Sequence, residues 1–378
     1  MNKEFRNEAL EAVVHGSGQV CWESPANIAL VKYWGKFPGQ LPMNASIGFA
    51  LEKSVVRIRM DYSLSSDTAF RLKDFLLNGQ VNSGFEERIG KYLESLFPFF
   101  PFLRRMELSV KSESTFPHSA GIASSAAAFS ALALCLCSIE RELRMVEKEP
   151  DSENNLRAEI PQMDPAFIAK ASFMARLGSG SACRSLEGGF VLWGKAPELP
   201  GSNDESAVRV SDDQVNPVFY SLRDAILIVD DSTKKVSSSA GHALMNGHAY
   251  REGRKAQAAA NMGDLLAAIR TGDEKKFFRV LENEALSLHS LMMSSDPAYI
   301  LLKPSTLLAL EKIIQFREQS GLSLGFTMDA GPNIHLIYFE RDAEQVKTFI
   351  MKELSVLCKD KRWIDDKMGP GPSRINPF

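Results

Sequence analysis

The order of apolar and polar positions in the first half of the chain predicts strands and hairpins interleaved with helices. Two apolar-rich stretches, 45–51 and 55–61, are expected to form neighbouring strands. Asn78-Gly79 is a strong hairpin signal, because both residues tolerate a positive φ. A helix is expected over 86–96 and an alternating strand over 105–111, so this half is predicted to mix strands and helices.

A long run of small residues follows, and 120–139 contains no charged residue. It is as long as a transmembrane helix. Alanine and serine dominate it, however, whereas a lipid-facing helix carries more Leu, Ile and Val. We therefore expect a helix buried between other elements. Asp164-Pro165 supplies an N-cap and a first helical residue for another helix through Leu177, and 188–194 is predicted to be a strand.

Between about 195 and 217 the chain turns polar and rich in Pro, Gly, Ser and Asp, which is typical of a segment between domains. Because 378 residues exceed one ordinary core, we expect two lobes, 1–215 and 216–378. The order strand, helices, hairpin, helix predicts an α+β second lobe with an antiparallel sheet. Its expected elements are a strand at 224–229, helices from 250 to 289 and up to Gly321, strands at 322–328 and 334–339, and a closing helix at 342–357.

Charge and cysteine content narrow the classes of function. Forty-four Lys and Arg residues against 47 Asp and Glu give a net charge of −3, so no overall basic field exists to hold a nucleic acid. The five cysteines have no metal-ligand spacing and are interpreted as reduced thiols. The first residues show no apolar run of the kind that marks a secretory signal. We therefore expect a cytoplasmic protein without a membrane segment.

The segment SAGIASSAAA, 119–128, has the character of a phosphate-binding helix start. Unpaired N–H groups in the first helical turn attract an anion, and small residues let phosphates approach the backbone. Gly121, Ser124 and Ser125 are the candidate contacts, and the two serines are also candidate Mg²⁺ ligands. The segment lacks the GK[ST] ending of a Walker loop, and a core helix with serine caps is the alternative.

Three further segments carry candidate chemistry. LGSGSACRS ends on Arg184, whose guanidinium can grip a carboxylate or phosphate, although a flexible connector with a surface arginine would look alike. DAGPN places Asp329 at a tight turn, where the aspartate can be simply a turn residue. SPANIALVKYWGK places Lys32 and Lys36 four residues apart, and a solvated aromatic and basic loop is its alternative.

Together and in this order, these segments resemble the diphosphomevalonate decarboxylase family of the GHMP kinase superfamily. The resemblance spans about 24–339 and includes LPMNASIG and DDSTKKVSS. It implies a two-lobed GHMP kinase fold of the α+β class, with an N-terminal ribosomal-protein-S5-like lobe and a C-terminal ferredoxin-like lobe. It also implies an ATP-dependent carboxy-lyase that converts mevalonate 5-diphosphate to isopentenyl diphosphate. ATP and Mg²⁺ are the implied cofactors, and a homodimer is expected.

The resemblance also implies roles for individual residues. Asp329 would be the general base for the substrate's 3-hydroxyl, and Lys32 would lie beside it. Arg184 would hold the substrate carboxylate, with Asn27 orienting the guanidinium. The residues expected to bind the diphosphate are Tyr33, Lys36, Ser46, Ser179 and Ser181.

Two positions depart from the family pattern: Gly48 stands where many relatives have a second serine, and His118 where threonine is common. The Gly48 departure keeps a decarboxylase of mevalonate 5-phosphate as an alternative. A kinase that only phosphorylates the 3-hydroxyl and a non-catalytic metabolite-binding homologue are further alternatives, and the retention of Asp329 and Arg184 argues against both. His242, His248 and His289 are expected to be structural, because isolated histidines are more often hydrogen-bonded in a core than ligands.

Overall fold

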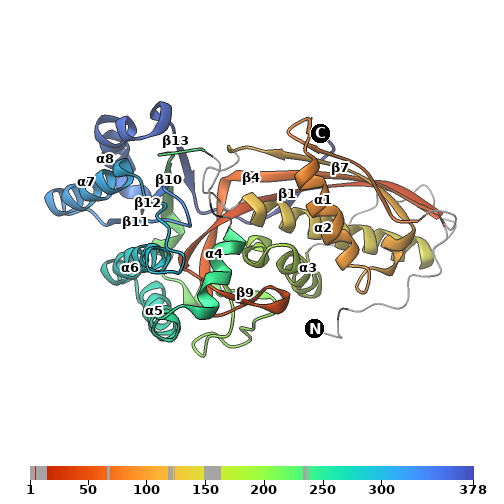
Figure 1. Cartoon of the computed structure of the whole chain (residues 1–378), viewed down its shortest axis with the longest axis horizontal. Helices are drawn as coiled ribbons and strands as arrows, with labels where there is room; N and C mark the ends of the chain where they lie inside the picture. Colours follow the sequence, from red (N-terminus) through yellow and green to blue (C-terminus); the bar gives the residue numbers. More distant parts are fainter. Residues whose placement is uncertain are drawn as a thin grey trace.

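The computed structural model describes residue 5, 15–65, 69–117, 122, 124–148, 163–232, 236 and 238–378. Runs of strands and runs of helices follow one another along the chain, as Figure 1 shows. The strands are β1 His15–Val31, β2 Lys36–Phe37, β3 Leu41–Pro42, β4 Ser46–Ser65, β5 Arg71–Leu77, β6 Gln80–Val81, β7 Met106–Ser114, β8 Phe190–Trp193, β9 Ala207–Arg209, β10 Leu222–Leu227, β11 Leu324–Thr327, β12 Ile334–Phe339, β13 Trp363–Lys367 and β14 Ser373–Arg374. The α-helices are α1 Ser83–Ser95, α2 Ser124–Lys148, α3 Pro165–Gly178, α4 Ser238–Leu244, α5 Arg251–Thr271, α6 Glu274–Met293, α7 Pro304–Ser320 and α8 Ala343–Phe349.

The N-terminal half is built on one sheet with the strand order β14-β1-β4-β7-β5-β6, and β8 and β9 extend it from β4. The predicted hairpin is confirmed, since Asn78 and Gly79 join β5 to β6 with φ values of 50° and 76°. The predicted cap of α3 is also confirmed, because the Asp164 carboxylate accepts the Phe167 N–H at 2.8 Å. Local turn and cap chemistry therefore determined these two elements.

The two strands predicted at 45–51 and 55–61 form the single 20-residue strand β4, so that prediction is wrong. The ladder with β1 shifts register here, from Pro25 opposite Val55 to Asn27 opposite Ala50. The polar residues between the two apolar runs bulge out of the ladder and do not turn the chain back. Their N–H groups are instead bound by a carboxylate from the far end of the chain, described below.

Helix α2 packs its small residues against the sheet, and residues from Ala126 to Ile139 are almost entirely buried. This confirms the prediction of a buried helix at this place. In the described part of the chain, no helix combines the length and apolarity needed to cross a membrane. All five cysteines are free and buried, as expected of reduced thiols.

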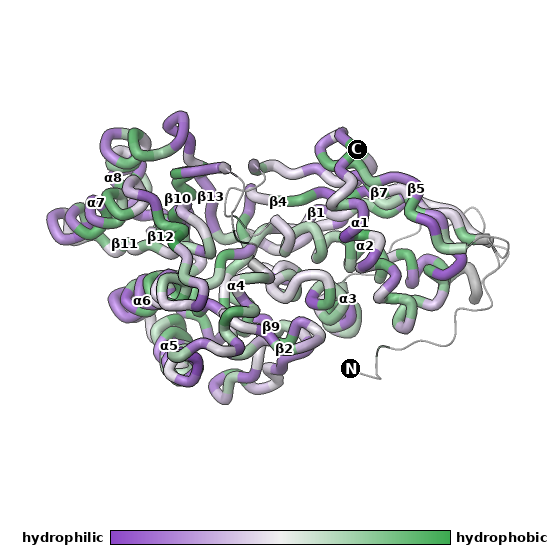
Figure 2. The backbone as a smooth tube through the Cα atoms, in the orientation of Figure 1, coloured by the Kyte–Doolittle hydropathy of each residue, from purple (hydrophilic) through white to green (hydrophobic). Residues whose placement is uncertain are grey.

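The second half contains an antiparallel four-stranded sheet with the order β11-β12-β10-β13. Residues of α5 and α6 join one face of this sheet to the core of the first half, whereas α7 and α8 cover the other face. In Figure 2 the strands β11 and β12 are mostly hydrophobic and the outer turns of α5 and α6 hydrophilic. Together these features confirm the α+β fold.

The chain after Leu357 returns across the molecule. A closing helix over 342–357 was only partly correct as a prediction, because α8 ends at Phe349 and short irregular turns lead to β13. Strand β13 completes the second sheet beside β10, and β14 then pairs with β1 in the first sheet. The C-terminus therefore lies over the first half of the chain (Figure 1). The boundary at 215/216 stays a prediction.

Asp366 on β13 links the two sheets. Its fully buried carboxylate accepts hydrogen bonds from the N–H groups of Glu52, Lys53 and Ser54 on β4, at 2.8–3.0 Å, and from Lys367 N–H. Hydrogen bonds from four N–H groups to one carboxylate are charge-assisted and therefore strong. The bulge in β4 thus depends on a residue more than 300 positions further along the chain.

We predict that Asp366→Ala lowers the free energy of unfolding by about 3 kcal/mol, because it leaves buried N–H groups without acceptors. Denaturant unfolding of the whole protein measures this loss. Asp213→Ala, a change at an exposed carboxylate, is the control and should stay within about 0.5 kcal/mol of the parent. Equal stability of both variants would contradict the proposed link.

Candidate active site

Lys32 and Asp329 meet between the two halves of the chain. Lys32 directly follows β1, and Asp329 lies in the turn between β11 and β12. The Lys32 Nζ atom is 2.8 Å from Asp329 Oδ1. The lysine side chain is only 2% exposed, whereas the aspartate side chain is 27% exposed. The carboxylate is therefore the partner that an incoming ligand can reach.

Burial and negatively charged neighbours act in opposite directions on the pKa of Lys32, and the net result is a pKa below that of a free lysine. Burial lowers the pKa of the Lys32 ammonium, and the positive charge of Arg184 lowers it further. The ion pair and hydrogen bond with Asp329 and the negative charge of Glu284 raise the pKa and oppose these effects. The ammonium form of Lys32 therefore depends on its two acidic neighbours.

The turn that carries Asp329 is fixed by side chains around it. The Asn333 side-chain amide makes a reciprocal pair of 3.0 Å hydrogen bonds with the backbone of Asp230. The Thr306 hydroxyl donates to the Pro332 carbonyl at 2.8 Å, and His289 Nε2 lies 3.1 Å from the Asp329 carbonyl oxygen. These contacts hold the main chain of the turn, so the carboxylate is presented from a rigid support. His289 is structural here, as expected.

Arg184 is fixed by Asn27. It lies in the 3₁₀ helix Gly180–Leu186, is 2% exposed, and donates from Nη2 and Nε to Asn27 Oδ1 at 2.9 and 3.2 Å. Asn27 is held in turn, because its amide donates to Ser185 Oγ at 2.7 Å. Burial lowers the pKa of the guanidinium, and nearby Asp329 opposes this effect. The structure thus brings Arg184 and Asn27 together in the arrangement that the resemblance implied.

Ser46 contacts Arg184, and its predicted role at the diphosphate stays a prediction. Its side chain is fully buried, its hydroxyl donates to the Val31 carbonyl at 2.7 Å, and Arg184 Nη1 donates to it. In this structure Ser46 therefore helps to hold Arg184. The neighbouring departure from the family pattern has a steric reason, because a Cβ atom at Gly48 would lie 2.3 Å from the Ile28 carbonyl oxygen.

The remaining residues expected at the diphosphate lie around the segment that follows Lys32. The Lys36 ammonium donates to Gln40 Oε1 at 2.9 Å, and Tyr33 packs edge-on against Trp193. Burial raises the pKa of the Tyr33 phenol, so the hydroxyl keeps its proton. Ser179 and Ser181, half-buried, flank Gly180 at the start of the 3₁₀ helix.

The start of α2 contacts this same group. Ser125 Oγ is 3.3 Å from Ser179 Oγ, so the predicted phosphate-binding helix start adjoins the predicted diphosphate site. Ser124 is the first residue of α2 and, like Ser125, is half-buried. Gly121 and His118 lie outside the described residues. Among the described residues, no group of three His, Cys, Asp or Glu side chains could hold a metal.

Arg88 lies near Lys36 and was not among the predicted site residues. Burial lowers the pKa of Lys36, and the charge of Arg88 on α1 lowers it further. Arg88 is exposed to solvent, as expected of a single arginine on an amphipathic helix, so no sequence pattern singles it out.

His242 on α4 positions the segment after Lys32. Its Nδ1 accepts the Gly35 N–H at 3.0 Å, and its ring stacks on Tyr33 at 4.5 Å and lies 4.5 Å from Trp34. Burial, with a smaller contribution from Lys36, lowers its pKa to about 3. His242 is therefore a neutral acceptor that fixes the main chain, as expected of a structural histidine.

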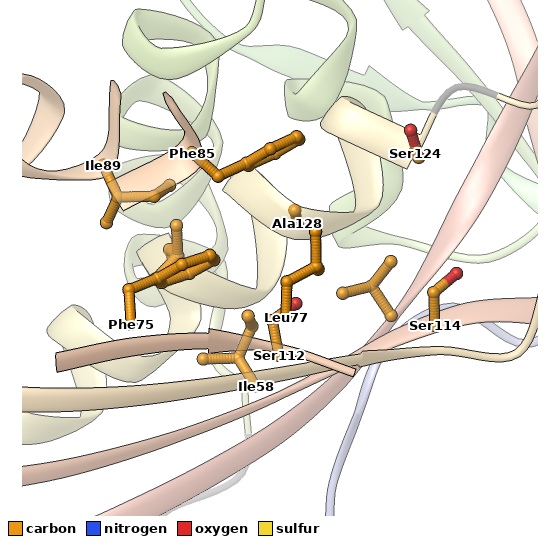
Figure 3. Close-up of a pocket in the computed structure, with 11 residues that line it drawn as sticks. Ile58, Phe75, Leu77, Phe85, Ile89, Ser112, Ser114, Ser124 and Ala128 are labelled. Carbon is orange, nitrogen blue, oxygen red and sulfur yellow. The ribbon is translucent and has the colours of Figure 1, made fainter. Parts of the chain in front are cut away.

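A small apolar cavity of about 10 Å³ lies beside the start of α2 (Figure 3). Figure 3 shows Phe75 from the sheet and Phe85 from α1 on its walls, with Ser124 and Ser114 at its edge. A cavity of this size has room for about one water molecule at most, so these side chains form part of the packed core beside the helix start.

Family models match both halves of the chain. Residues 24–207 match the diphosphomevalonate decarboxylase-like N-terminal domain, and residues 225–370 match the mevalonate 5-diphosphate decarboxylase C-terminal domain. The diphosphomevalonate decarboxylase of Gibberella zeae is 32% identical over 339 residues, covering 85% of this chain and 81% of the relative.

Solved structures agree with this assignment. The mevalonate diphosphate decarboxylase from Staphylococcus aureus is 27% identical, with a TM-score of 0.77, over 96% of this chain and 99% of that one. A protein named MDDEF, solved in complex with MVAPP, AMPPCP and magnesium, is 25% identical, with a TM-score of 0.75, over 96% of this chain and all of that one. The chain described here is a member of the diphosphomevalonate decarboxylase family.

Proposed function

We propose that the chain catalyses the ATP-dependent decarboxylation of mevalonate 5-diphosphate, forming isopentenyl diphosphate, ADP, phosphate and CO₂. The observation that carries this proposal is the Lys32–Asp329 ion pair, with the Asn27-bound guanidinium of Arg184 within electrostatic reach of both. An accessible carboxylate beside two buried cations suits a substrate that must lose a proton and carries a carboxylate.

In the first step Asp329 takes the proton of the 3-hydroxyl, and the alcohol oxygen forms a bond to the γ-phosphorus of ATP. The bond from that phosphorus to the β–γ bridging oxygen breaks, and ADP leaves with the electron pair. Lys32 keeps the carboxylate ionised and stabilises charge on the transferring group. General-base groups contribute about 10²–10⁴-fold to such a step. The fixed turn around Asp329 supports this role, because it holds the base in one position.

In the second step the C1–C2 bond breaks and its electron pair forms the C2–C3 double bond. The C3–O bond breaks at the same time and phosphate leaves, while C1 departs as CO₂. Arg184 would hold the carboxylate so that this bond lines up with the departing phosphate. Its support by Asn27 and Ser46 leaves the guanidinium little freedom to turn.

The nucleotide phosphates would bind at Gly121, Ser124 and Ser125, at the start of α2. Mg²⁺ would be held by the serine hydroxyls together with the phosphate oxygens, and it would neutralise charge during transfer. The substrate's diphosphate would contact Lys36, Arg88, Tyr33, Ser179 and Ser181. Two cations in one region suit a diphosphate, and the crowded Gly48 backbone explains why this chain does without a second serine there. A homodimer and a cytoplasmic location are proposed on family grounds.

The first test is to measure ADP and CO₂ with Mg²⁺-ATP and either mevalonate 5-diphosphate or mevalonate 5-phosphate. We expect equal amounts of ADP and CO₂ from the diphosphate only. A preference for the monophosphate would replace the proposed substrate. Formation of ADP without CO₂ would make the protein a kinase. Formation of neither product would indicate a binding protein.

Asp329→Asn should lower turnover by about 10²–10⁴-fold and leave ATP binding intact, because it removes the base and preserves its shape. Steady-state kinetics and calorimetric titration with ATP measure the two quantities. The control is Asp264→Asn, at an exposed ion pair on α5, which should behave as the parent. Decarboxylation by Asp329→Asn at the parental rate would refute the assigned base.

Arg184→Lys should lower kcat by about 10²-fold or more, since an ammonium keeps the charge and loses the two-pronged contact with Asn27. The matched control is Arg223→Lys, which alters another largely buried arginine, paired with Glu340 and Asp365 away from the site. If both variants kept the parental kcat, Arg184 would have no orienting role.

A further inference from the structure

Arg254 on α5 and Glu284 on α6 form a buried ion pair beneath the active site. Their side chains are 2% and 0% exposed. Arg254 Nη1 and Nη2 donate to Glu284 Oε1 and Oε2 at 2.8 and 2.6 Å, which is the bidentate geometry of a strong pair. Asn261 also donates to Glu284 Oε1, at 2.6 Å. These three hydrogen bonds fix the two side chains relative to each other, independently of their contacts with Lys32.

This pair binds both main-chain groups of Lys32. The Lys32 N–H donates to Glu284 Oε2 at 2.8 Å, and Arg254 Nη2 donates to the Lys32 carbonyl oxygen at 2.6 Å. Strand β1 ends at Val31, and Asn44 is the further donor to that carbonyl, at 2.9 Å. Buried backbone groups need partners, and at Lys32 two charged side chains of the second half provide them.

A buried ion pair is a costly way to satisfy one peptide group. Its desolvation penalty can exceed the attraction between the charges, so such pairs often give little net stability. What this one does offer is precision, because two bidentate groups on neighbouring helices fix the residue that carries the ammonium. The desolvation penalty of the Arg254–Glu284 pair is consistent with a role in positioning Lys32 and not in stabilising the fold.

Several charges act on the Lys32 ammonium from the elements around it. Asp329 and Glu284 favour the charged form, and Arg184 opposes it. Burial raises the pKa of Asp224 on β10 and the nearby charge of Lys32 opposes this effect, whereas Arg254 is bound to Glu284. Glu284 is thus the acidic neighbour of Lys32 that the substrate does not need to contact.

We propose that Arg254 and Glu284 are positioning residues for phosphoryl transfer: they fix the main chain of Lys32 so that its ammonium meets Asp329, and Glu284 supplies negative charge that favours the ammonium form. This inference rests on the proposed function, in which Lys32 acts as a cation. Neither residue touches the reacting atoms, so both act through Lys32.

The first test is the pH dependence of kcat/KM in Glu284→Gln, which keeps an acceptor oxygen and removes the charge. Lys32 acts protonated, so activity falls as pH rises through its pKa. Glu284 raises that pKa, and its loss should therefore move the decline at high pH to lower pH. A purely structural residue would not move this limb.

The second test is Arg254→Lys, which preserves both charges and cannot hold Glu284 and the Lys32 carbonyl together in the same way. We expect kcat to fall about tenfold or more, with KM near that of the parent and the high-pH limb in its place. The two variants thus separate position from charge. If Glu284→Gln does not fold, Arg254→Lys still tests whether the ion pair positions Lys32.

The matched control is Glu140→Gln, which removes the charge from another buried ion pair, that of Glu140 on α2 with Lys170 at 2.6 Å. Thermal unfolding should show it destabilised, with kcat and the high-pH limb unchanged. The inference is overturned if Arg254→Lys keeps the parental kcat, or if folded Glu284→Gln keeps the parental limb. An inactive parent would overturn the proposed function and this inference together, whereas an active parent with unaffected variants overturns this inference alone.

Discussion

The burial of two positive charges close together is the constraint on which the site depends. Lys32 and Arg184 are each about 2% exposed, and each repels the other's charged form. Such an arrangement survives only where acceptors and carboxylates are placed around it. Asp329, Glu284, Asn27 and Ser46 perform this task, and they come from both halves of the chain. The two halves are therefore held together by these hydrogen bonds and ion pairs as well as by a shared apolar core.

The local chemistry of the sequence predicted much of the fold. The Asn78-Gly79 hairpin, the Asp164 cap and the buried small-residue helix all follow from properties of a few adjacent residues. The wrong prediction at 52–54 has the opposite cause. A polar interruption looks the same whether the chain turns or bulges, and the group that decides the matter, Asp366, is distant in the sequence.

The site was predicted unevenly for the same reason. Lys32, Asp329, Arg184 and Asn27 were named through a resemblance, since no periodicity relates residues about 300 positions apart. Ser46 was assigned to a ligand, which stays a prediction, and its contact with Arg184 was not foreseen. Arg254 and Glu284 could not be recognised, because a charged residue on a helix reads as solvent-facing until its neighbours are known. Sequence patterns thus identify chemical groups more readily than the groups that support them.

The path of the C-terminal strands β13 and β14 has a consequence for how the chain folds during synthesis. The chain is synthesised from its N-terminus, so β1 and β4 exist long before β13 and β14. Until the last residues are made, the β4 bulge lacks the Asp366 carboxylate and the edge of β1 lacks its partner. The first half can form helices and most of its sheet early, but its final hydrogen bonds require long-range closure. A chain that ended at Lys367 would contain every residue assigned to the site but would lack β14, so the edge of β1 at Trp22 and Glu23 would have no partner strand.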